Sequence, residues 1–418
     1  MIFKTENESP RGRISLFKAL AEEQIEASST LITSLDHCLS CRACEKMCPS
    51  QVDYATISKL GRELIAAKVP HYKPALQQKL VEKLLVTQSL HPLLKFSVRA
   101  IAPLQSYLGK KLGQPLENHP SLAAAGNFSH EIAVDSSNSS PLQEYYPAGE
   151  NAPRLTQKPT PQVILFKGCS SDLFEQHTLK DSITLLNACQ FDVIIPDKQH
   201  CCGAINTRHG DIAGIKELAQ QNIKQFESSL QNSRAIISIT NSCSAHLKDY
   251  HKLTDICGAE DFSAKTADII SFLAHAVKTA NIKFSPLSQQ AEEAQDKTAV
   301  EVEVGVHIPC SLKNVLQEEQ LLFDLLENIP GIRLIKINDQ YCCGAAGSYM
   351  LQYPDIAKRL LEDKIEDVIK HNYQLIVSSN IGCSLHFKQG LRKHENKTGR
   401  TIEVIHPVRL LARQLIHS

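Results

Sequence analysis

Twelve of the fourteen cysteines in this 418-residue chain fall into three groups whose spacing suits metal or redox chemistry. One group is a compact run near the N-terminus. Each of the other two combines a lone cysteine, a Cys-Cys-Gly triplet and a second lone cysteine. Thiolates are soft ligands for zinc and iron–sulfur clusters, and they also carry out disulfide exchange. These three groups are therefore the candidate functional residues.

The N-terminal run consists of Cys38, Cys41, Cys44 and Cys48, followed directly by Pro49. Spacings of two, two and three residues before a proline are the bacterial-ferredoxin signature of a [4Fe-4S] cluster. We expect the first three cysteines to surround one cluster from a tight turn, and Cys48 to leave it along a helix. In ferredoxins with two such runs the fourth cysteine binds the other cluster, so Cys48 either completes its own cluster or serves a second motif. Structural zinc is the alternative, although zinc ligands usually come as separated pairs.

The two remaining groups are in register with each other. The first cysteine group is Cys169, Cys201, Cys202 and Cys243, and the second is Cys310, Cys342, Cys343 and Cys383. Thirty-one residues separate the first two members in both groups, and forty or thirty-nine separate the last two. The chain therefore contains an internal duplication, which we describe as a first and a second copy.

Four thiols per copy match the ligand number of a four-iron cluster. Gly203 and Gly344 provide the backbone bend that two adjacent cysteines need to aim at one object. A histidine follows each closing cysteine by three residues, at His246 and His386, on the same face if that segment is helical. Each is either a fifth ligand, a donor to a cluster sulfur or an ordinary packed histidine. The other two cysteines, at positions 189 and 257, have no counterparts and are expected to be ordinary apolar residues.

Short apolar runs alternate with helical stretches in both copies, which predicts parallel α/β units. We expect strands at 162–167, 191–196 and 235–240 in the first copy, and at 302–308, 332–337 and 375–379 in the second. The cysteines follow these strands, so they should converge in the crevice at the carboxyl ends of each sheet.

The predicted fold class is α/β, with a helical ferredoxin-like N-terminal region followed by two duplicated parallel α/β domains. The predicted boundaries are a ferredoxin-type domain at 1–128, a linker at 129–160, the first cysteine-rich domain at 161–283, a linker at 284–300 and the second cysteine-rich domain at 301–418. Within the N-terminal domain we expect a turn at 9–13 and then a helix through Leu31. Residues 59–111 carry ten basic and two acidic side chains. This basic stretch is either a docking face for an acidic partner or lipid headgroups, or an ordinary solvated face.

Composition limits the functional classes. The 45 basic and 45 acidic residues balance, so no global field indicates a nucleic-acid partner. The sequence shows no signal peptide and no apolar run of membrane-spanning length, which predicts a cytoplasmic, reducing location where cysteines bind metals or act as redox thiols. We find no phosphate-binding loop, dinucleotide fingerprint or hydrolase triad, and predict no catalytic residue. Arg208 and His209 are expected to be surface residues.

Several phrases resemble the iron–sulfur subunits of glycolate oxidase, within the cysteine-rich (CCG) family that also includes subunits of heterodisulfide reductase and of anaerobic glycerol-3-phosphate dehydrogenase. The similar phrases are 9–14, 36–45, 342–349, 354–357, 380–383 and His406-Pro407. Family members usually have two ferredoxin motifs flanking the phrase Pro-Arg-Gly-Arg, whereas this sequence contains one. Heterodisulfide reductase relatives end the pattern with Cys-x-x-Cys, whereas both copies here have Cys-x-x-His.

The resemblance implies an electron-transfer subunit that binds at least one [4Fe-4S] cluster, with further four-iron clusters possible in the two copies. All twelve grouped cysteines are predicted to bind cofactor, and metal ligation is assigned to the N-terminal run and the second group. A separate flavoprotein would oxidise glycolate to glyoxylate, and electrons would pass to a membrane acceptor such as quinone, with this chain peripheral on the cytoplasmic face of the inner membrane. The alternatives are a heterodisulfide reductase-like thiol/disulfide catalyst, or the iron–sulfur subunit of a lactate or glycerol-3-phosphate dehydrogenase.

Overall fold

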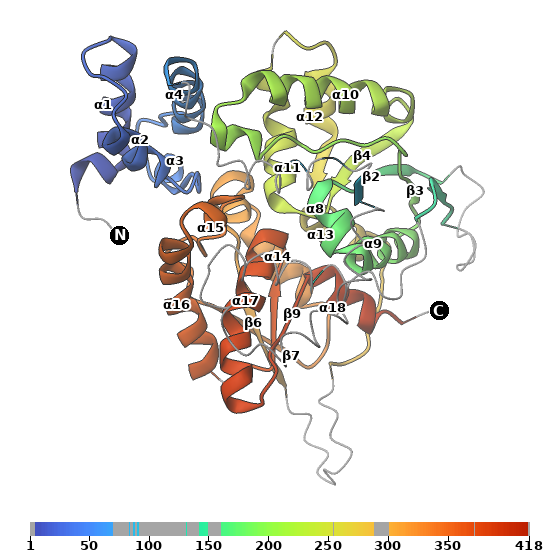
Figure 1. The fold of residues 1–418 in the computed structure, drawn as a ribbon. Helices are drawn as coiled ribbons and strands as arrows, with labels where there is room; N and C mark the ends of the chain where they lie inside the picture. Colours follow the sequence, from blue (N-terminus) through green and yellow to red (C-terminus); the bar gives the residue numbers. More distant parts are fainter. Residues whose placement is uncertain are drawn as a thin grey trace.

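The computed structural model describes residues 5–69, 142–148, 160–253, 255–287, 301–371 and 373–416, together with residues 83, 87, 90, 91 and 131. Two sheets of the same topology organise it (Figure 1). In the first copy the strands are β2 (Gln162–Phe166), β3 (Asp192–Ile194), β4 (Ser233–Ser238) and β5 (Thr266–Asp268). In the second they are β6 (Val302–His307), β7 (Ile332–Lys336), β8 (Leu375–Ser378) and β9 (Glu403–Ile405).

The strand order shows that the duplication extends to the fold. The first sheet runs β3-β2-β4-β5 with β1 (Tyr145–Tyr146) added antiparallel at its edge, and the second runs β7-β6-β8-β9. All pairs other than the one involving β1 are parallel. The predicted α/β class and the duplicated parallel arrangement are confirmed. The six predicted strands agree with the structure to within two residues at either end, while the three-residue strands β5 and β9 were not predicted.

Helices cover both faces of each sheet. Those of the first copy are α8 (Cys169–Phe174), α9 (Gln176–Ala188), α10 (Ile212–Leu230), α11 (Asn241–Lys248), α12 (Ala259–Lys265) and α13 (Ile269–Thr279), with the 3-10 turns η3 (Asn206–His209) and η4 (Asp249–Lys252). Those of the second are the π-helix η5 (Ser311–Leu316), α14 (Glu319–Leu326), α15 (Tyr349–Gln352), α16 (Pro354–Lys370), α17 (Ile381–Thr398) and α18 (Pro407–Gln414).

The two copies share one hydrophobic core. Helix α9 packs on α18, and α13 packs on α14, so these four helices lie between the two sheets (Figure 1). The apolar cluster between them includes side chains of both copies, among them Val163, Ile237 and Leu273 from the first and Val306 and Leu411 from the second. Outside this shared core, α10 and α12 cover the first sheet, and α16 and α17 cover the second.

The N-terminal region is helical, as predicted, and comprises η1 (Glu6–Glu8), α1 (Pro10–Ala21), α2 (Ser29–Asp36), α3 (Ala43–Lys46) and α4 (Tyr54–Lys68) around an apolar cluster of their own. The predicted turn at 9–13 is wrong. Ser9 caps α1 by accepting a hydrogen bond from the backbone N–H of Gly12, and Pro10 occupies the first helical position, where its missing N–H costs nothing. The predicted helix through Leu31 is interrupted between α1 and α2.

Two further sequence predictions fall largely outside the described residues. The basic stretch at 59–111 is described only to residue 69 and at four isolated positions, and most of both predicted linkers is likewise undescribed. Within the described part, no helix is both long and apolar enough to cross a membrane.

Candidate redox site

The second cysteine group comes together at the carboxyl ends of β6, β7 and β8. Cys310 precedes η5, Cys342 and Cys343 lie in the loop after β7, and Cys383 is in the first turn of α17. The Sγ atoms of Cys343 and Cys383 are 3.1 Å apart. The thiol of Cys342 accepts hydrogen bonds from both Cys310 and Cys343, so the four sulfurs form one continuous set of contacts.

The first cysteine group repeats this arrangement around the ends of β2, β3 and β4. The Sγ atoms of Cys169 and Cys201 are 3.4 Å apart, and Cys202 contacts both Cys201 and Cys243. Of these residues, Cys201, Cys202 and Cys243 are buried. Each copy thus gathers four buried or half-buried sulfur donors, which is the donor set that iron–sulfur clusters and zinc require. Ligation itself stays a prediction.

The two glycines that follow the cysteine pairs have the bend that the sequence predicted. Gly203 has φ +88° and Gly344 has φ +89°, in the region that L side chains rarely adopt. Each glycine also donates its backbone N–H to a sulfur, Gly203 to Cys201 and Gly344 to Cys342, both at 3.4 Å. The bend therefore turns a main-chain donor toward the thiols as well as reversing the chain.

The N-terminal run brings three of its four thiols together. Electrostatic interactions connect Cys41 with both Cys38 and Cys44. Burial raises the pKa of Cys41 to about 12, so this thiol needs a bound cation to ionise at neutral pH. Cys48 follows α3 by two residues in an irregular segment, and the next helix starts at Tyr54, so the prediction that Cys48 leaves along a helix is wrong. Its role as fourth ligand stays a prediction.

A family model for the cysteine-rich domain called CCG matches residues 163–248 and 304–388, which contain both groups of four thiols. The chain carries two CCG domains. The predicted recognition of this domain, and of its duplication, is confirmed.

Named relatives extend the similarity beyond these domains. A probable glycolate oxidase iron–sulfur subunit of Bacillus subtilis is 28% identical over 99% of this chain and 89% of its own length. The glycolate oxidase iron–sulfur subunit of Escherichia coli is 25% identical over 91% of this chain and 84% of its own length. Lactate utilization protein A of Shouchella clausii is 26% identical over 60% of this chain and 98% of its own length. The predicted resemblance to glycolate oxidase iron–sulfur subunits is confirmed.

The N-terminal cysteine loop contacts the second CCG domain. The thiol of Cys41 interacts electrostatically with Cys342 and Cys310. Asn314, on η5, donates its side-chain N–H to the carbonyl of Cys41 at 2.9 Å, and Lys46 donates to the carbonyl of Lys313 at 3.0 Å. The loop that carries the ferredoxin-like thiols therefore contacts the second CCG domain directly.

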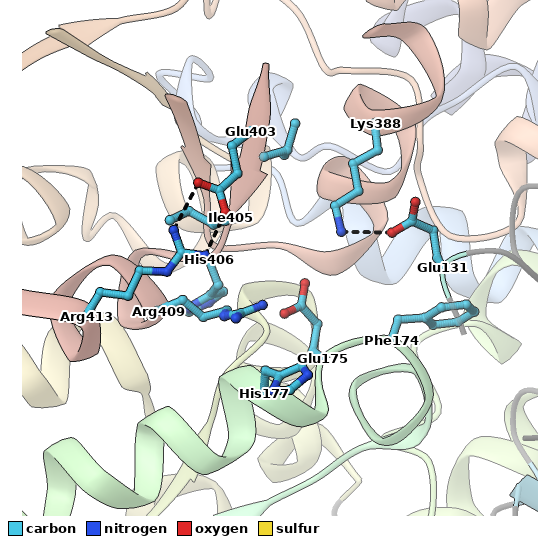
Figure 2. Close-up of a pocket in the computed structure, with 11 residues that line it drawn as sticks. Glu131, Phe174, Glu175, His177, Lys388, Glu403, Ile405, His406, Arg409 and Arg413 are labelled. Carbon is cyan, nitrogen blue, oxygen red and sulfur yellow. Dashed lines mark hydrogen bonds and ion pairs between the residues drawn. The ribbon is translucent and has the colours of Figure 1, made fainter. Parts of the chain in front are cut away.

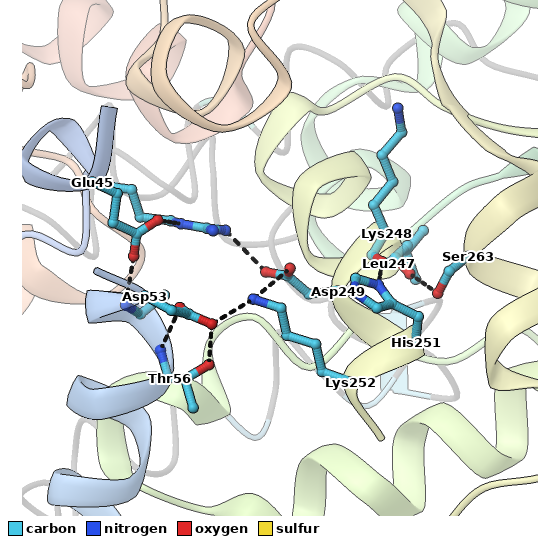
Figure 3. Close-up of polar contacts among 11 residues, drawn as sticks. Glu45, Asp53, Thr56, Leu247, Lys248, Asp249, His251, Lys252 and Ser263 are labelled. Carbon is cyan, nitrogen blue, oxygen red and sulfur yellow. Dashed lines mark hydrogen bonds and ion pairs between the residues drawn. The ribbon is translucent and has the colours of Figure 1, made fainter. Parts of the chain in front are cut away.

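Ion pairs fix the same loop to the first CCG domain (Figure 3). Arg42 pairs with Glu45 at 2.6 Å in its own loop and with Asp249 at 3.0 Å across the interface. Asp53, which caps α4, pairs with Lys252 at 3.2 Å. The loop thus contacts both CCG domains through side chains that flank its cysteines.

Arg208 was predicted to be a surface residue, and this prediction is wrong. Its side chain is buried and donates to the carbonyls of Asp36 at 2.8 Å and Cys38 at 3.3 Å. Its guanidinium also lies 4.7 Å from the ring centre of Tyr349, which is a cation–π contact. Tyr349 is the residue of the second copy that corresponds to Arg208 in the first. Nothing in the local sequence distinguishes such a residue, because its partners are remote main-chain groups.

Both predicted histidines lie on helices beside the cysteine pairs, and His386 is buried whereas His246 is half-buried. The Nε2 atom of His246 on α11 has no hydrogen-bond partner among the described residues, and neither has the Nδ1 atom of His386 on α17. Burial lowers the pKa of each to about 4, so both rings are neutral at physiological pH. The Nε2 atom of His246 lies 3.4 Å from the Cβ position that an alanine at Gly203 would have. Buried ring nitrogens without partners fit a ligand or donor role toward a bound group.

A third histidine was missed by the sequence interpretation. His307, the last residue of β6, places a ring nitrogen within 4.8 Å of the Sγ atoms of Cys343 and Cys383. Its Nδ1 atom is 2.9 Å from the hydroxyl of Ser378. In the first copy the corresponding position, three residues before the first cysteine, is Phe166. The spacing His-x-x-Cys was the available signal, and the two CCG domains differ at this point.

A charged cavity of about 290 Å³ lies apart from the thiols, where the two CCG domains meet (Figure 2). Glu175 and His177 line it from the first domain, and Glu403, Arg409 and Arg413 line it from the second. Its charges are largely paired within the protein: Glu403 bonds Arg413 at 2.6 Å and 2.9 Å, and Arg409 lies 3.4 Å from a carboxylate on α9. Because these charges pair with each other across and beside the cavity, we interpret it as part of the packing between the two domains and not as a ligand site.

Proposed function

We propose that the chain is the iron–sulfur electron-transfer subunit of a flavin-linked 2-hydroxy-acid dehydrogenase that oxidises glycolate to glyoxylate. The contact that carries this proposal joins the ferredoxin-like loop to the second CCG domain, where Asn314 donates to the carbonyl of Cys41 and Lys46 donates to the carbonyl of Lys313. Two thiol groups with the donor chemistry of iron–sulfur centres, placed side by side, suit a relay. The names of the relatives that cover most of the chain support the same function.

The chemistry requires a partner. Oxidation of a 2-hydroxy acid to a 2-oxo acid releases two electrons and two protons, which a flavin in a separate subunit would accept. Iron–sulfur centres carry electrons one at a time, and a quinone at the membrane would take two electrons and two protons as the final acceptor. In this proposal the chain's own residues hold the centres, exclude water from them and connect them.

The residues proposed to hold the centres are the four thiols of the N-terminal run and the four of each CCG domain. The convergence of the thiols in each CCG domain fits a group that needs soft anionic sulfur. His246, His386 and His307 are proposed as additional neutral ligands or donors. A [4Fe-4S] centre is proposed for the N-terminal run on the basis of its spacing.

Anaerobic purification with iron and sulfide analysis, combined with EPR, tests the proposal. About four iron atoms per chain would indicate the N-terminal centre alone, and about eight to twelve would indicate one or both CCG domains as well. The purified chain alone should not oxidise glycolate, and adding the flavoprotein should produce activity. Glycolate oxidation by the chain without flavin, or zinc without acid-labile sulfide, would reject the proposal.

One observation favours a second candidate, a thiol/disulfide catalyst of the heterodisulfide reductase kind. The hydrogen bonds from Cys310 and Cys343 lower the pKa of Cys342 well below its ordinary value, which is typical of reactive thiols. This candidate predicts disulfide reduction by the purified chain that collapses in Cys342→Ser. Wild-type rates in that variant would exclude it.

The substrate of the proposed dehydrogenase is tested separately. Activity of the chain with the flavoprotein is compared on glycolate, lactate and glycerol 3-phosphate, and the highest activity should be on glycolate.

A further inference from the structure

Helices α10 and α16 occupy equivalent places in the two CCG domains. A Cβ atom on Gly203 would lie 3.6 Å from the Cα of Ile215 on α10, and a Cβ atom on Gly344 would lie 3.0 Å from the Cα of Ala357 on α16. Ile215 and Ala357 are therefore corresponding residues. Counting from this pair fixes the correspondence along both helices.

Seven residues further along, which is two helical turns, the two domains differ in charge. The first domain has Asn222 and the second has Lys364, and both side chains are buried, with exposures of 0% and 2%. Asn222 accepts from the backbone N–H of His200 at 2.9 Å and donates to the carbonyl of Cys201 at 3.1 Å. It supports the first cysteine pair as a neutral group.

Lys364 brings a cation to the second cysteine group. Its ammonium donates to the carbonyl of Asn338, in the segment that leads from β7 to the cysteine pair. The same ammonium interacts electrostatically with Cys342, Cys343 and Cys383. A lysine is almost never fully buried without such anionic partners. At the corresponding position the first domain has Asn222, which carries no charge.

A buried cation stabilises whichever state of a neighbouring site carries more negative charge. The two domains differ in this respect by geometry. In the second domain the ammonium of Lys364 bonds the segment that leads to the cysteine pair, whereas the equivalent side chain in the first domain is the neutral amide of Asn222, which bonds the carbonyl of Cys201.

We propose that Lys364 raises the reduction potential of the centre in the second CCG domain above that of the first, so that electrons in the chain collect beside the N-terminal cysteine loop. This inference rests on the proposed function. Reduction adds one electron to the centre, and Lys364 stabilises that added negative charge where Asn222 does not. In the exchange the first centre loses one electron and the second gains it, with the reduced flavin of the partner subunit as the source. His307 also has no counterpart in the first domain, so the effect of Lys364 is measured by comparing Lys364→Met with the wild type, in both of which His307 is present.

EPR-monitored potentiometric titration of the anaerobic full-length chain tests the inference. The signal lost in Cys343→Ser belongs to the second domain, and the signal lost in Cys202→Ser belongs to the first. In the wild type the second-domain signal should titrate at the higher potential. Lys364→Met should lower its one-electron reduction constant at least tenfold, a fall of about 59 mV per factor of ten. The first-domain potential should not change.

Two variants control for effects other than charge. Lys358→Met removes a lysine from the same helix whose side chain is 61% exposed, and its potentials should match the wild type. Lys364→Arg keeps the charge and should keep the potential. If Lys364→Met does not fold, Lys364→Gln replaces it, because an amide keeps a donor for the carbonyl of Asn338 without the charge, and its second-domain potential should fall in the same way.

The failures are distinguishable. An equal or higher potential for the first domain in the wild type, or an unchanged second-domain potential in Lys364→Met with full iron content, overturns this inference and leaves the proposed function standing. Absence of iron and sulfide from the second CCG domain alone overturns this inference and leaves the proposed function standing, and their absence from the whole chain overturns both.

Discussion

Gly344 offers a sharp test of how the cysteine pair of the second CCG domain is held. With φ at +89°, an alanine here adopts a backbone conformation that costs about 1–2 kcal/mol for an L-residue. Its Cβ atom would also lie 2.6 Å from the carbonyl oxygen of Ala357. That oxygen belongs to the backbone of α16 and cannot rotate away. Overpacking of this kind typically adds about 1–3 kcal/mol.

Two matched variants separate strain from overlap. Gly203 has nearly the same φ, +88°, but a Cβ atom there would have its nearest neighbour at 3.4 Å. Gly347, with φ +65°, would have none within 4 Å. All three Gly→Ala changes reduce the entropy of the unfolded chain equally, so this contribution cancels in the comparison. We therefore expect Gly344→Ala to lower the free energy of unfolding by about 1–3 kcal/mol more than either control.

Urea unfolding followed by circular dichroism measures this difference. Because a chain with several domains need not unfold in one step, the midpoints of the transition are compared among the three variants. Iron content after reconstitution gives a second measurement, and Gly344→Ala should lose iron from the second CCG domain while Gly203→Ala loses it only from the first. Equal midpoints for all three variants would refute the argument that contact with α16 fixes this bend.

Three further predictions address ligation, pH and the interface. Cys343→Ser should lower the iron content of the reconstituted chain, while Cys189→Ser, which changes a buried cysteine outside the groups, should leave it unchanged; equal iron contents would contradict the assignment. Burial raises the pKa of Asp268 to about 6, against the hydrogen bonds it accepts. Since the pKa of Asp268 in the folded state lies above its value in the unfolded state, the stability from this group is complete below about pH 4 and is lost as pH rises through 6. The urea midpoint of the wild type should therefore fall over this range. Asp268→Asn should remove the fall, and a fall that persists in this variant would point to another group. Arg62→Gln should cost about 3 kcal/mol or more in free energy of unfolding, because the buried guanidinium donates to two main-chain carbonyls, at 2.8 Å and 3.2 Å, and pairs with a carboxylate. Arg11→Gln, at an exposed ion pair, should change the unfolding midpoint little, and similar losses in both would argue against burial as the cause.

Local patterns predicted the parts of this fold that local forces determine. The apolar runs before the cysteines became strands because parallel strands covered on both faces need continuous apolar sequence, as in Val163–Phe166. The strands β5 and β9 were missed since three residues are too few to show a period. The turn predicted at 9–13 was wrong because proline and glycine were interpreted as turn residues when Ser9 and Pro10 start a helix.

The candidate site shows the same division. Cysteine spacing located both groups of four, because each cysteine follows a predicted strand and the carboxyl ends of parallel strands meet at one edge of a sheet. Arg208 was missed, since its partners are carbonyl groups far away in the chain. Lys364 and Asn222 are ordinary residues of amphipathic helices until the two copies are aligned through their neighbours in space. The candidate role of these residues depends on tertiary contacts, which the local sequence pattern does not show.

The shared core between α9, α13, α14 and α18 has a consequence for how such a molecule can change. Its layout is that of a symmetric homodimer whose two halves have been joined into one polypeptide. In a homodimer every substitution appears at both sites at once, so the sites must remain identical. Once both halves are encoded separately, a lysine can enter one site while an asparagine stays in the other. The fusion thus permits a single assembly to hold two unlike centres, a condition that a directional current of electrons requires.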